Sequence, residues 1–158
     1  MPSANTIDDV DARGPRFSAW LTSAVLIVAL LVAGFSATAA AILLAAQTAV
    51  FAVGALGGPR AHPYGRLFAA LAAPRLGPVT QREPVPPLRF AQLLGFVFAA
   101  TGTAGFVLGQ FGLGAAATAA ALFAAFLNAA FDVCLGCRLY PFAARLRRAP
   151  VRPHATTG

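Results

Sequence analysis

The chain has 158 residues, of which 58% are hydrophobic and only 11% charged, and its mean hydropathy is +0.72. Soluble globular domains carry about 25% charged residues, so this composition excludes an ordinary soluble domain. The net charge is +7, from 12 arginines without any lysine against 5 acidic residues. Because most of the chain carries no charge, the basic excess does not indicate nucleic acid as a partner. The sequence predicts a membrane protein whose first partner is the lipid bilayer.

Residues 1–15 form an arm that we expect to be flexible, and residues 149–158 form a tail that we expect to be disordered. Residues 16–148 between them are predicted to form a single membrane domain. The arm contains Asp8, Asp9 and Asp11 rather than the purely basic start of a secretory signal. The apolar run after it also continues directly into a second apolar segment. Cleavage of a signal peptide is therefore disfavoured.

Two stretches lack charged residues altogether, at positions 17–59 and 90–131. A membrane-spanning helix needs about 20 apolar residues, and each stretch is roughly twice as long, so each must fold back as a hairpin. Gly34-Phe35-Ser36 and the glycine-rich segment 109–114 supply the breaks. The sequence predicts an all-α protein with two tandem hairpins, at 17–59 and 90–133. The four predicted spans are Phe17–Ala33, Ala37–Leu56, Phe90–Leu108 and Leu113–Val133.

All 12 arginines fall before residue 17, in the central loop 60–89 or after residue 137, and none falls in the two hairpin turns. The positive-inside rule places such segments on the cytoplasmic side. We therefore expect both termini and the central loop to face the cytoplasm.

The central loop contains Tyr64, Leu67, Phe68 and Leu71 at helical spacing, with arginines beside them. This pattern predicts a short helix over residues 63–71 that lies on the inner membrane surface. Four prolines follow it and favour an extended, semi-rigid connection to the second hairpin. These are Pro78, Pro84, Pro86 and Pro87.

The two halves of the chain resemble each other in sequence. Residues 37–41 (ATAAA) match residues 117–121, and Arg60-Ala61-His62-Pro63-Tyr64 echoes Arg138-Leu139-Tyr140-Pro141-Phe142. We interpret this as a tandem duplication of a hairpin unit, with both copies in one orientation. The first match places Cys134 and Cys137 on Gly54 and Gly57 of the first unit.

Small and polar residues within the predicted spans suggest how the helices pack. Gly105 and Gly109 form a G-x-x-x-G pattern, which we expect to pack against another helix of the same chain. Gln47 and Thr48 of the second span, with Asn128 of the fourth, are candidates for hydrogen bonds between helices.

Cys134 and Cys137 are the only cysteines and form a C-x-x-C motif, expected at the cytoplasmic end of the fourth span. Two small residues that pack at a helix end are the simpler interpretation. A candidate catalytic redox pair is the other, with one thiol attacking and the other resolving. Since cytosolic disulfides are rare, we expect a dithiol at rest. Metal binding is the weaker alternative, because a zinc site needs four ligands and only His62 or His154 could add to the two sulfurs. The sequence predicts no resident metal and no cofactor.

Asp132 and Arg138 flank the motif and are the candidates for tuning its thiols. At the carboxyl end of a helix the dipole disfavours a thiolate, and Asp132 acts in the same direction while Arg138 opposes it. Asp132 could instead form an ion pair with Arg138 or with an arginine of the central loop.

The chain resembles a bacterial, mainly actinobacterial, family of integral-membrane proteins catalogued as domain of unknown function 4395. The resemblance extends from Asp11 to Arg148, and its most specific part is Leu127-Asn128-Ala129 followed by Cys134-Leu135-Gly136-Cys137 and Tyr140. It implies a location in the bacterial cytoplasmic membrane. It also implies thiol or sulfur chemistry by association with thioredoxin-like or sulfurtransferase proteins, one of which would be the cytosolic partner. Asp132 and Arg138 depart from the family pattern, which has a small or apolar residue and an acidic residue there.

Two functions follow as hypotheses from these observations. The first is thiol–disulfide or persulfide exchange by the C-x-x-C motif at the cytoplasmic face. The alternative is a small transporter, or a membrane assembly or structural factor, in which the cysteines are not catalytic. Whether the protein is an enzyme remains open at this point.

Overall fold

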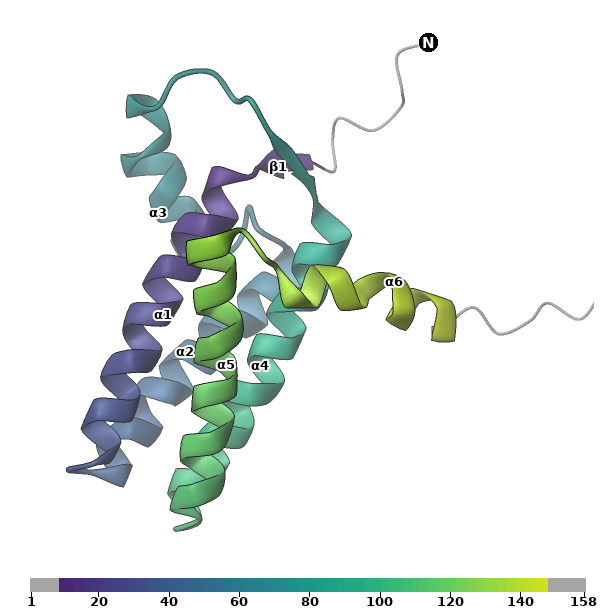
Figure 1. The fold of residues 1–158 in the computed structure, drawn as a ribbon. Helices are drawn as coiled ribbons and strands as arrows, with labels where there is room; N and C mark the ends of the chain where they lie inside the picture. Colours follow the sequence, from purple (N-terminus) through teal and green to yellow (C-terminus); the bar gives the residue numbers. More distant parts are fainter. Residues whose placement is uncertain (1–8, 148–158) are drawn as a thin grey trace, which may run out of the picture.

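The computed structural model describes residues 9–147, which form a bundle of four long helices with shorter elements at one end (Figure 1). The long helices are α1 (Arg13–Ala33), α2 (Ala37–Gly57), α4 (Val85–Val107) and α5 (Phe111–Phe131). Each is long and apolar enough to cross a membrane. The predicted all-α membrane fold with four spans is therefore confirmed. Residues 1–8 of the arm and the tail after Arg147 lie outside the described residues.

Both hairpin turns form at the predicted breaks. At the first, Ser36 precedes α2, and its hydroxyl oxygen accepts a hydrogen bond of 3.2 Å from the backbone N–H of Ala39. At the second, Gly109 has a positive φ of 71°, a conformation that costs glycine little. The two turns lie at one end of the bundle, and the segments that carry the arginines lie at the other, the arginine end (Figure 1).

The long helices pack in the cyclic order α1, α2, α4, α5, so each contacts its two antiparallel neighbours. The apolar core lies in the half near the hairpin turns. Leu26, Leu44 and Phe106 fill it together with small alanines from α1, α2 and α5. The half near the arginine end contains the cavities described below and the buried side chains of Ser18, Thr22 and His62, while Gln47 lies at the middle of α2.

Close approach between α4 and α5 depends on glycine at position 105. A Cβ atom at Gly105 would lie 2.5 Å from the backbone nitrogen of Gly114, so no larger residue fits. This confirms that the Gly105 face packs within the chain. Gly109 does not take part in this contact, because it forms the turn and has no atom within 4 Å of its Cβ position.

The arm and the central loop are joined by a short antiparallel sheet at the arginine end. Strand β1 (Asp9–Asp11) pairs with β2 (Arg82–Pro84), with Val10 opposite Glu83. Residues 9–15, which the sequence placed in a flexible arm, thus form β1 and the first turn of α1. Pro86 and Pro87 belong to the first turn of α4 rather than to an extended connection, since this turn needs no backbone N–H donors.

The predicted short helix of the central loop is present as α3 (Pro63–Leu71), followed by a 3₁₀ turn, η1 (Ala73–Arg75). Phe68 is only 6% exposed and packs on Phe17 of α1, with the ring centroids 5.7 Å apart. Leu67 and Leu71 stay exposed. The helix is therefore attached to α1 by its aromatic face.

A further short helix, α6 (Leu135–Arg147), was not predicted. It begins shortly after the end of α5 and runs across the end of the bundle, away from it (Figure 1). Leu139, Phe142 and Leu146 form an exposed apolar stripe on it, at 51%, 64% and 87% exposure. Arginines 138, 145 and 147 belong to the same helix. Such an amphipathic helix is suited to the membrane–water interface.

The order of the helices repeats along the chain, which supports the interpretation of a duplication. Helix α2 ends at Gly57 and α5 ends at Phe131, and each is followed by a short helix. The contacts repeat as well, since α1 packs on α3 and α5 while α4 packs on α6 and α2. When the ends of α2 and α5 are matched, Gly54 and Gly57 correspond to residues before the motif, so their alignment with the cysteines is wrong. His62 and Cys134 occupy equivalent places instead, because each directly precedes its short helix.

We expect the substitution Gly105→Leu to destabilise the bundle, because a leucine would force α5 away from α4. Overpacking of this kind costs about 1–3 kcal/mol. Thermal unfolding in detergent measures the effect. Gly112→Leu is the matched control, since a Cβ at Gly112 on α5 meets no atom within 4 Å. Equal melting temperatures for the two variants would contradict the contact.

Candidate functional site

The two cysteines lie at the start of α6 and not at the end of the fourth span, which corrects the sequence prediction. Helix α5 ends at Phe131, and Asp132 takes a left-handed conformation with φ of 57° that turns the chain away. Cys134 directly precedes α6, and its carbonyl oxygen accepts a hydrogen bond of 3.1 Å from the N–H of Arg138. Cys137 lies in the first turn of that helix.

The sulfurs of Cys134 and Cys137 are joined in a disulfide, with the Cα atoms 5.2 Å apart. The sequence predicted a resting dithiol, so the structure represents the oxidised partner of that couple. The backbone N–H of Cys137 also donates to Sγ of Cys134 at 3.2 Å. One turn of helix therefore brings the two sulfurs within bonding distance of each other.

The position at a helix start reverses the expected electrostatics of the motif. The amino-terminal end of a helix carries partial positive charge and unpaired N–H groups, and both stabilise a thiolate. The N–H of Cys137 already points at Sγ of Cys134. The arrangement therefore favours Cys134 as the thiolate, whereas a site at the end of α5 would have disfavoured it.

Asp132 and Arg138, the predicted tuning residues, do not form an ion pair with each other. Within residues 9–147 the structure shows one ion pair, between Arg13 and Asp11 at 2.8 Å. Asp132 lies near Glu83 of β2 instead: burial raises the pKa of Glu83, and the Asp132 carboxylate adds to that rise. Arg138 is exposed in the first turn of α6. Asp132 thus acts as the residue that ends α5.

Gly136, between the two cysteines, attaches the motif to the bundle. A Cβ atom there would lie 2.5 Å from Cα and 2.6 Å from Cβ of Ala91 on α4. One turn later, Tyr140 contacts Phe90 with the ring centroids 6.0 Å apart. The motif is therefore held against α4 by direct contact between the backbone of Gly136 and Ala91.

A cavity of about 270 Å³ lies beneath the motif, and we call it the cysteine cavity. Cys134, Gly136 and Leu139 contribute to its wall from the side of α6, and Gln92 of α4 and Asn128 of α5 are among its polar lining residues. Asn128 was expected to form a hydrogen bond between helices. Instead it lies at this cavity and is only partly buried.

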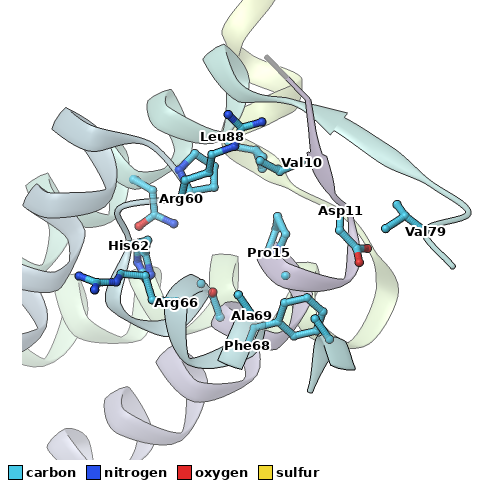
Figure 2. A pocket seen from close by; sticks show the side chains of 16 residues that line it. Val10, Asp11, Pro15, Arg60, His62, Arg66, Phe68, Ala69, Val79 and Leu88 are labelled. Carbon is cyan, nitrogen blue, oxygen red and sulfur yellow. The ribbon is translucent and has the colours of Figure 1, made fainter. Parts of the chain in front are cut away.

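A second cavity of about 370 Å³ lies between α1 and α3, and we call it the histidine cavity (Figure 2). His62, Arg60 and Phe68 line it from the central loop and α3, and Pro15 lines it from α1. Its place in the first unit corresponds to that of the cysteine cavity in the second, since each lies between a first span and a short helix. The two cavities share the lining residues Pro15, Ser18, Leu88 and Gln92.

His62 belongs to a buried polar cluster that the sequence did not bring together. It is 2% exposed, Gln47 is 1% exposed, and the Tyr64 hydroxyl donates to Oε1 of Gln47 at 2.8 Å. Gly54 makes room for the cluster, because a Cβ there would lie 2.5 Å from the His62 ring and 3.0 Å from Gln92. Gln47 thus bonds to α3 rather than to another span.

The His62 imidazole is neutral at physiological pH. Burial lowers the pKa of His62 to about 4, and the neighbouring Gln92 amide opposes this shift only in part. Neither ring nitrogen meets a partner with hydrogen-bond geometry among the described residues, and the same holds for Nε2 of Gln47 and Oε1 of Gln92. The cluster therefore has both donors and acceptors without partners; His62 lines the histidine cavity, and Gln92 lines both cavities.

The remaining polar candidates have local roles. The Thr48 hydroxyl donates to the carbonyl oxygen of Leu44 in its own helix at 2.7 Å, so it does not link two spans. His62 does not join the cysteines as a metal ligand: in residues 9–147, no three His, Cys, Asp or Glu side chains are grouped as a metal site. His154 lies outside the described residues.

Comparison with known families identifies the chain. The family described as domain of unknown function DUF4395 matches residues 10–145, and the chain belongs to this family. No curated protein and no solved structure gives a significant match. The match includes all four spans, both short helices except the end of α6, and the C-x-x-C motif.

We expect Gly136→Ala to displace α6 from α4 and to make the cysteines more accessible. The added methyl group would overlap Ala91, at a cost of about 1–3 kcal/mol. The rate of maleimide labelling of the reduced protein measures the accessibility of the thiols. Gly77→Ala is the control, because a Cβ at that loop position meets no atom within 4 Å. An unchanged labelling rate in Gly136→Ala would contradict the proposed attachment.

Proposed function

We propose that this multi-pass membrane protein exchanges thiols and disulfides through Cys134 and Cys137 at the arginine end of the bundle. The observation that carries the proposal is the placement of both sulfurs at the start of α6, within bonding reach of each other. A helix start stabilises the thiolate that exchange requires. The docking of Gly136 on α4 holds the pair in place.

In the exchange, Cys134 is the attacking thiolate and Cys137 the resolving one. Sγ of Cys134 attacks one sulfur of a partner disulfide, forms a mixed disulfide and releases the partner's other sulfur as a thiolate. Sγ of Cys137 then attacks Sγ of Cys134 and releases the partner's second thiolate. The partner disulfide gains two electrons and the C-x-x-C dithiol loses two. The reverse sequence reduces the internal disulfide.

A thioredoxin-like or sulfurtransferase protein of the cytosol is the partner that we propose. With a sulfurtransferase the electrophile is the outer sulfur of a persulfide. Sγ of Cys134 would attack it, form its own persulfide and release the cysteine of the sulfurtransferase as a thiolate. Sγ of Cys137 would then attack the inner sulfur, close the disulfide and release the outer sulfur as hydrogen sulfide. Both reactions use the same pair of sulfurs in the same order.

The alternative of a small transporter has less support from the positions of the polar side chains. His62, Gln92 and Asn128 lie toward the arginine end and Gln47 lies at the middle of α2. In the other half apolar side chains such as Leu26 fill the core, and the buried Thr118 hydroxyl bonds within its own helix. A structural or assembly role, with cysteines that only pack, remains the competing hypothesis. The two cysteine variants described next separate it from exchange.

Exchange by this route predicts that the two cysteine variants behave differently. Cys137→Ser should accumulate a mixed disulfide with a thioredoxin partner, because the resolving thiol is missing. Cys134→Ser should accumulate little, because its remaining thiol lacks the position before α6. Non-reducing gels measure the trapped complex, with a single-cysteine thioredoxin variant that is activated as a mixed disulfide with thionitrobenzoate, so that no second thioredoxin thiol can reverse the trap. Equal amounts in both variants would contradict the assignment of roles, and no complex in either would favour packing.

We also propose that the arginine end faces the cytoplasm of a bacterial cell, with both termini inside. The support is the placement of the described arginines at that end of the bundle, away from the uncharged hairpin turns. Reporter fusions at the carboxyl terminus should therefore be active only with a cytoplasmic reporter such as a fluorescent protein. Activity of a periplasmic phosphatase reporter there would invert the topology and place the motif on the oxidising side.

A further inference from the structure

The cysteine cavity extends from the motif into the apolar part of the bundle. On α5 its lining residues run from Asn128 to Ala120, a distance of about 12 Å along the helix. On α4 they include Leu88, near the start of the helix, and Phe98, near its middle. Cys134 lies at one end of the cavity, so the cavity connects a redox-active sulfur with the depth of the membrane spans.

The lining selects an apolar ligand with few polar atoms. Alanine, leucine and phenylalanine side chains dominate the wall. Apart from Cys134, the polar side chains in the wall are two amides, Gln92 and Asn128, and two hydroxyls, Ser18 and Thr22. An amide can donate to a carbonyl oxygen, and the wall has no cationic side chain that would recognise an anion. A planar ring with carbonyl oxygens matches this set of groups.

We propose that the cysteine cavity binds the ring of a membrane quinone, which oxidises the dithiol of Cys134 and Cys137. This inference rests on the proposed function, because it names the electron acceptor of the same pair. A dithiol and a quinone each exchange two electrons and two protons, so the couples match without a one-electron intermediate. A quinone also dissolves in the bilayer that surrounds the spans, whereas a soluble disulfide reaches the motif from outside the cavity.

The proposed reaction balances in atoms and electrons. Sγ of Cys134 adds as a thiolate to the quinone ring, and Sγ of Cys137 then attacks Sγ of Cys134. The S–S bond forms, the bond between sulfur and ring breaks, and its electron pair stays on the ring. The two protons lost by the thiols complete the hydroquinone. The products are one disulfide and one hydroquinone for each dithiol and quinone.

Pre-reduced protein in nanodiscs, mixed without oxygen with decylubiquinone, tests the proposal. This quinone has a fully substituted ring, so uncatalysed addition of thiols to free ring carbons does not interfere. We expect one hydroquinone for each disulfide, measured by the loss of quinone absorbance and by maleimide labelling of the remaining thiols. Cys137→Ser should stop the formation of hydroquinone, because the second attack is lost.

Matched variants on α5 locate the site. Ala124 lines the cavity, and Ala124→Phe should slow oxidation by decylubiquinone about tenfold, as loss of roughly 1.4 kcal/mol of binding would. Ala116→Phe adds the same bulk on an exposed position of the same helix and should leave the rate unchanged. Asn128→Leu removes the amide at similar volume and should also slow the reaction, which keeps the test valid if Ala124→Phe fails to fold.

The outcomes distinguish this inference from the proposed function. If a soluble disulfide oxidises the dithiol and decylubiquinone does not, the quinone site is wrong and exchange stands. If neither oxidises it, both proposals are wrong. Oxidation that none of the α5 variants slows would show that the quinone reacts elsewhere and would overturn the quinone site.

Discussion

The bilayer gives the backbone no hydrogen-bond partner, and the rest of this structure follows from that constraint. Every N–H and C=O group in the spans must be paired within its own helix, so the two long uncharged stretches can only become helical hairpins. Lipid is as apolar as the helix surfaces, so the helices associate through close packing. Helix α4 shows how this is achieved: Gly95 faces Phe51 of α2, and Gly105 faces Gly114 of α5. The small residues of α4 thus determine how its neighbours approach.

The duplicated architecture explains why His62 and the C-x-x-C motif lie at the same end of the bundle, the arginine end. Each hairpin is followed by a short helix that packs on the first span of its own unit, and each unit has a cavity in the angle between them. The residue just before the short helix is His62 in one unit and Cys134 in the other. One unit therefore holds a neutral, buried imidazole at this place, and the other holds the disulfide of the C-x-x-C motif. Gln92 lies at both cavities and joins the two units.

The four spans could be predicted from the sequence because a charged side chain in the apolar membrane interior is costly. A stretch without charged residues that is long enough for two spans is therefore a strong signal. The prediction failed at the boundary between α5 and α6, where apolar residues continue through Val133 and Leu135. The break is made by Asp132 in a left-handed conformation, which sequence patterns assign first to glycine or asparagine. The error mattered chemically, because it placed the cysteines at the negative instead of the positive end of a helix.

Other features could not be predicted, because the elements are very short or because the residues that meet are far apart in the sequence. The strands β1 and β2 are too short to show alternation, and they lie on opposite sides of the whole first hairpin and most of the central loop. Gln47, His62 and Gln92 meet from α2, the loop before α3, and α4, so no local pattern could group them. One signal was available: Gln47 is a polar side chain within an otherwise apolar span, and such residues have buried partners.

The attachment of α6 bears on whether the motif acts as a catalyst of exchange or as a switch. If the disulfide alone held Cys134 near Cys137, its reduction would release the start of α6, and the redox state would control the helix. The contacts are different. The hydrogen bond from Arg138 to Cys134, the contact of Gly136 with Ala91 and the packing of Tyr140 on Phe90 do not involve the sulfur–sulfur bond. Because these contacts do not depend on that bond, we expect them to keep the two thiols aligned after reduction as well. A pair that keeps its geometry through oxidation and reduction is organised for repeated exchange.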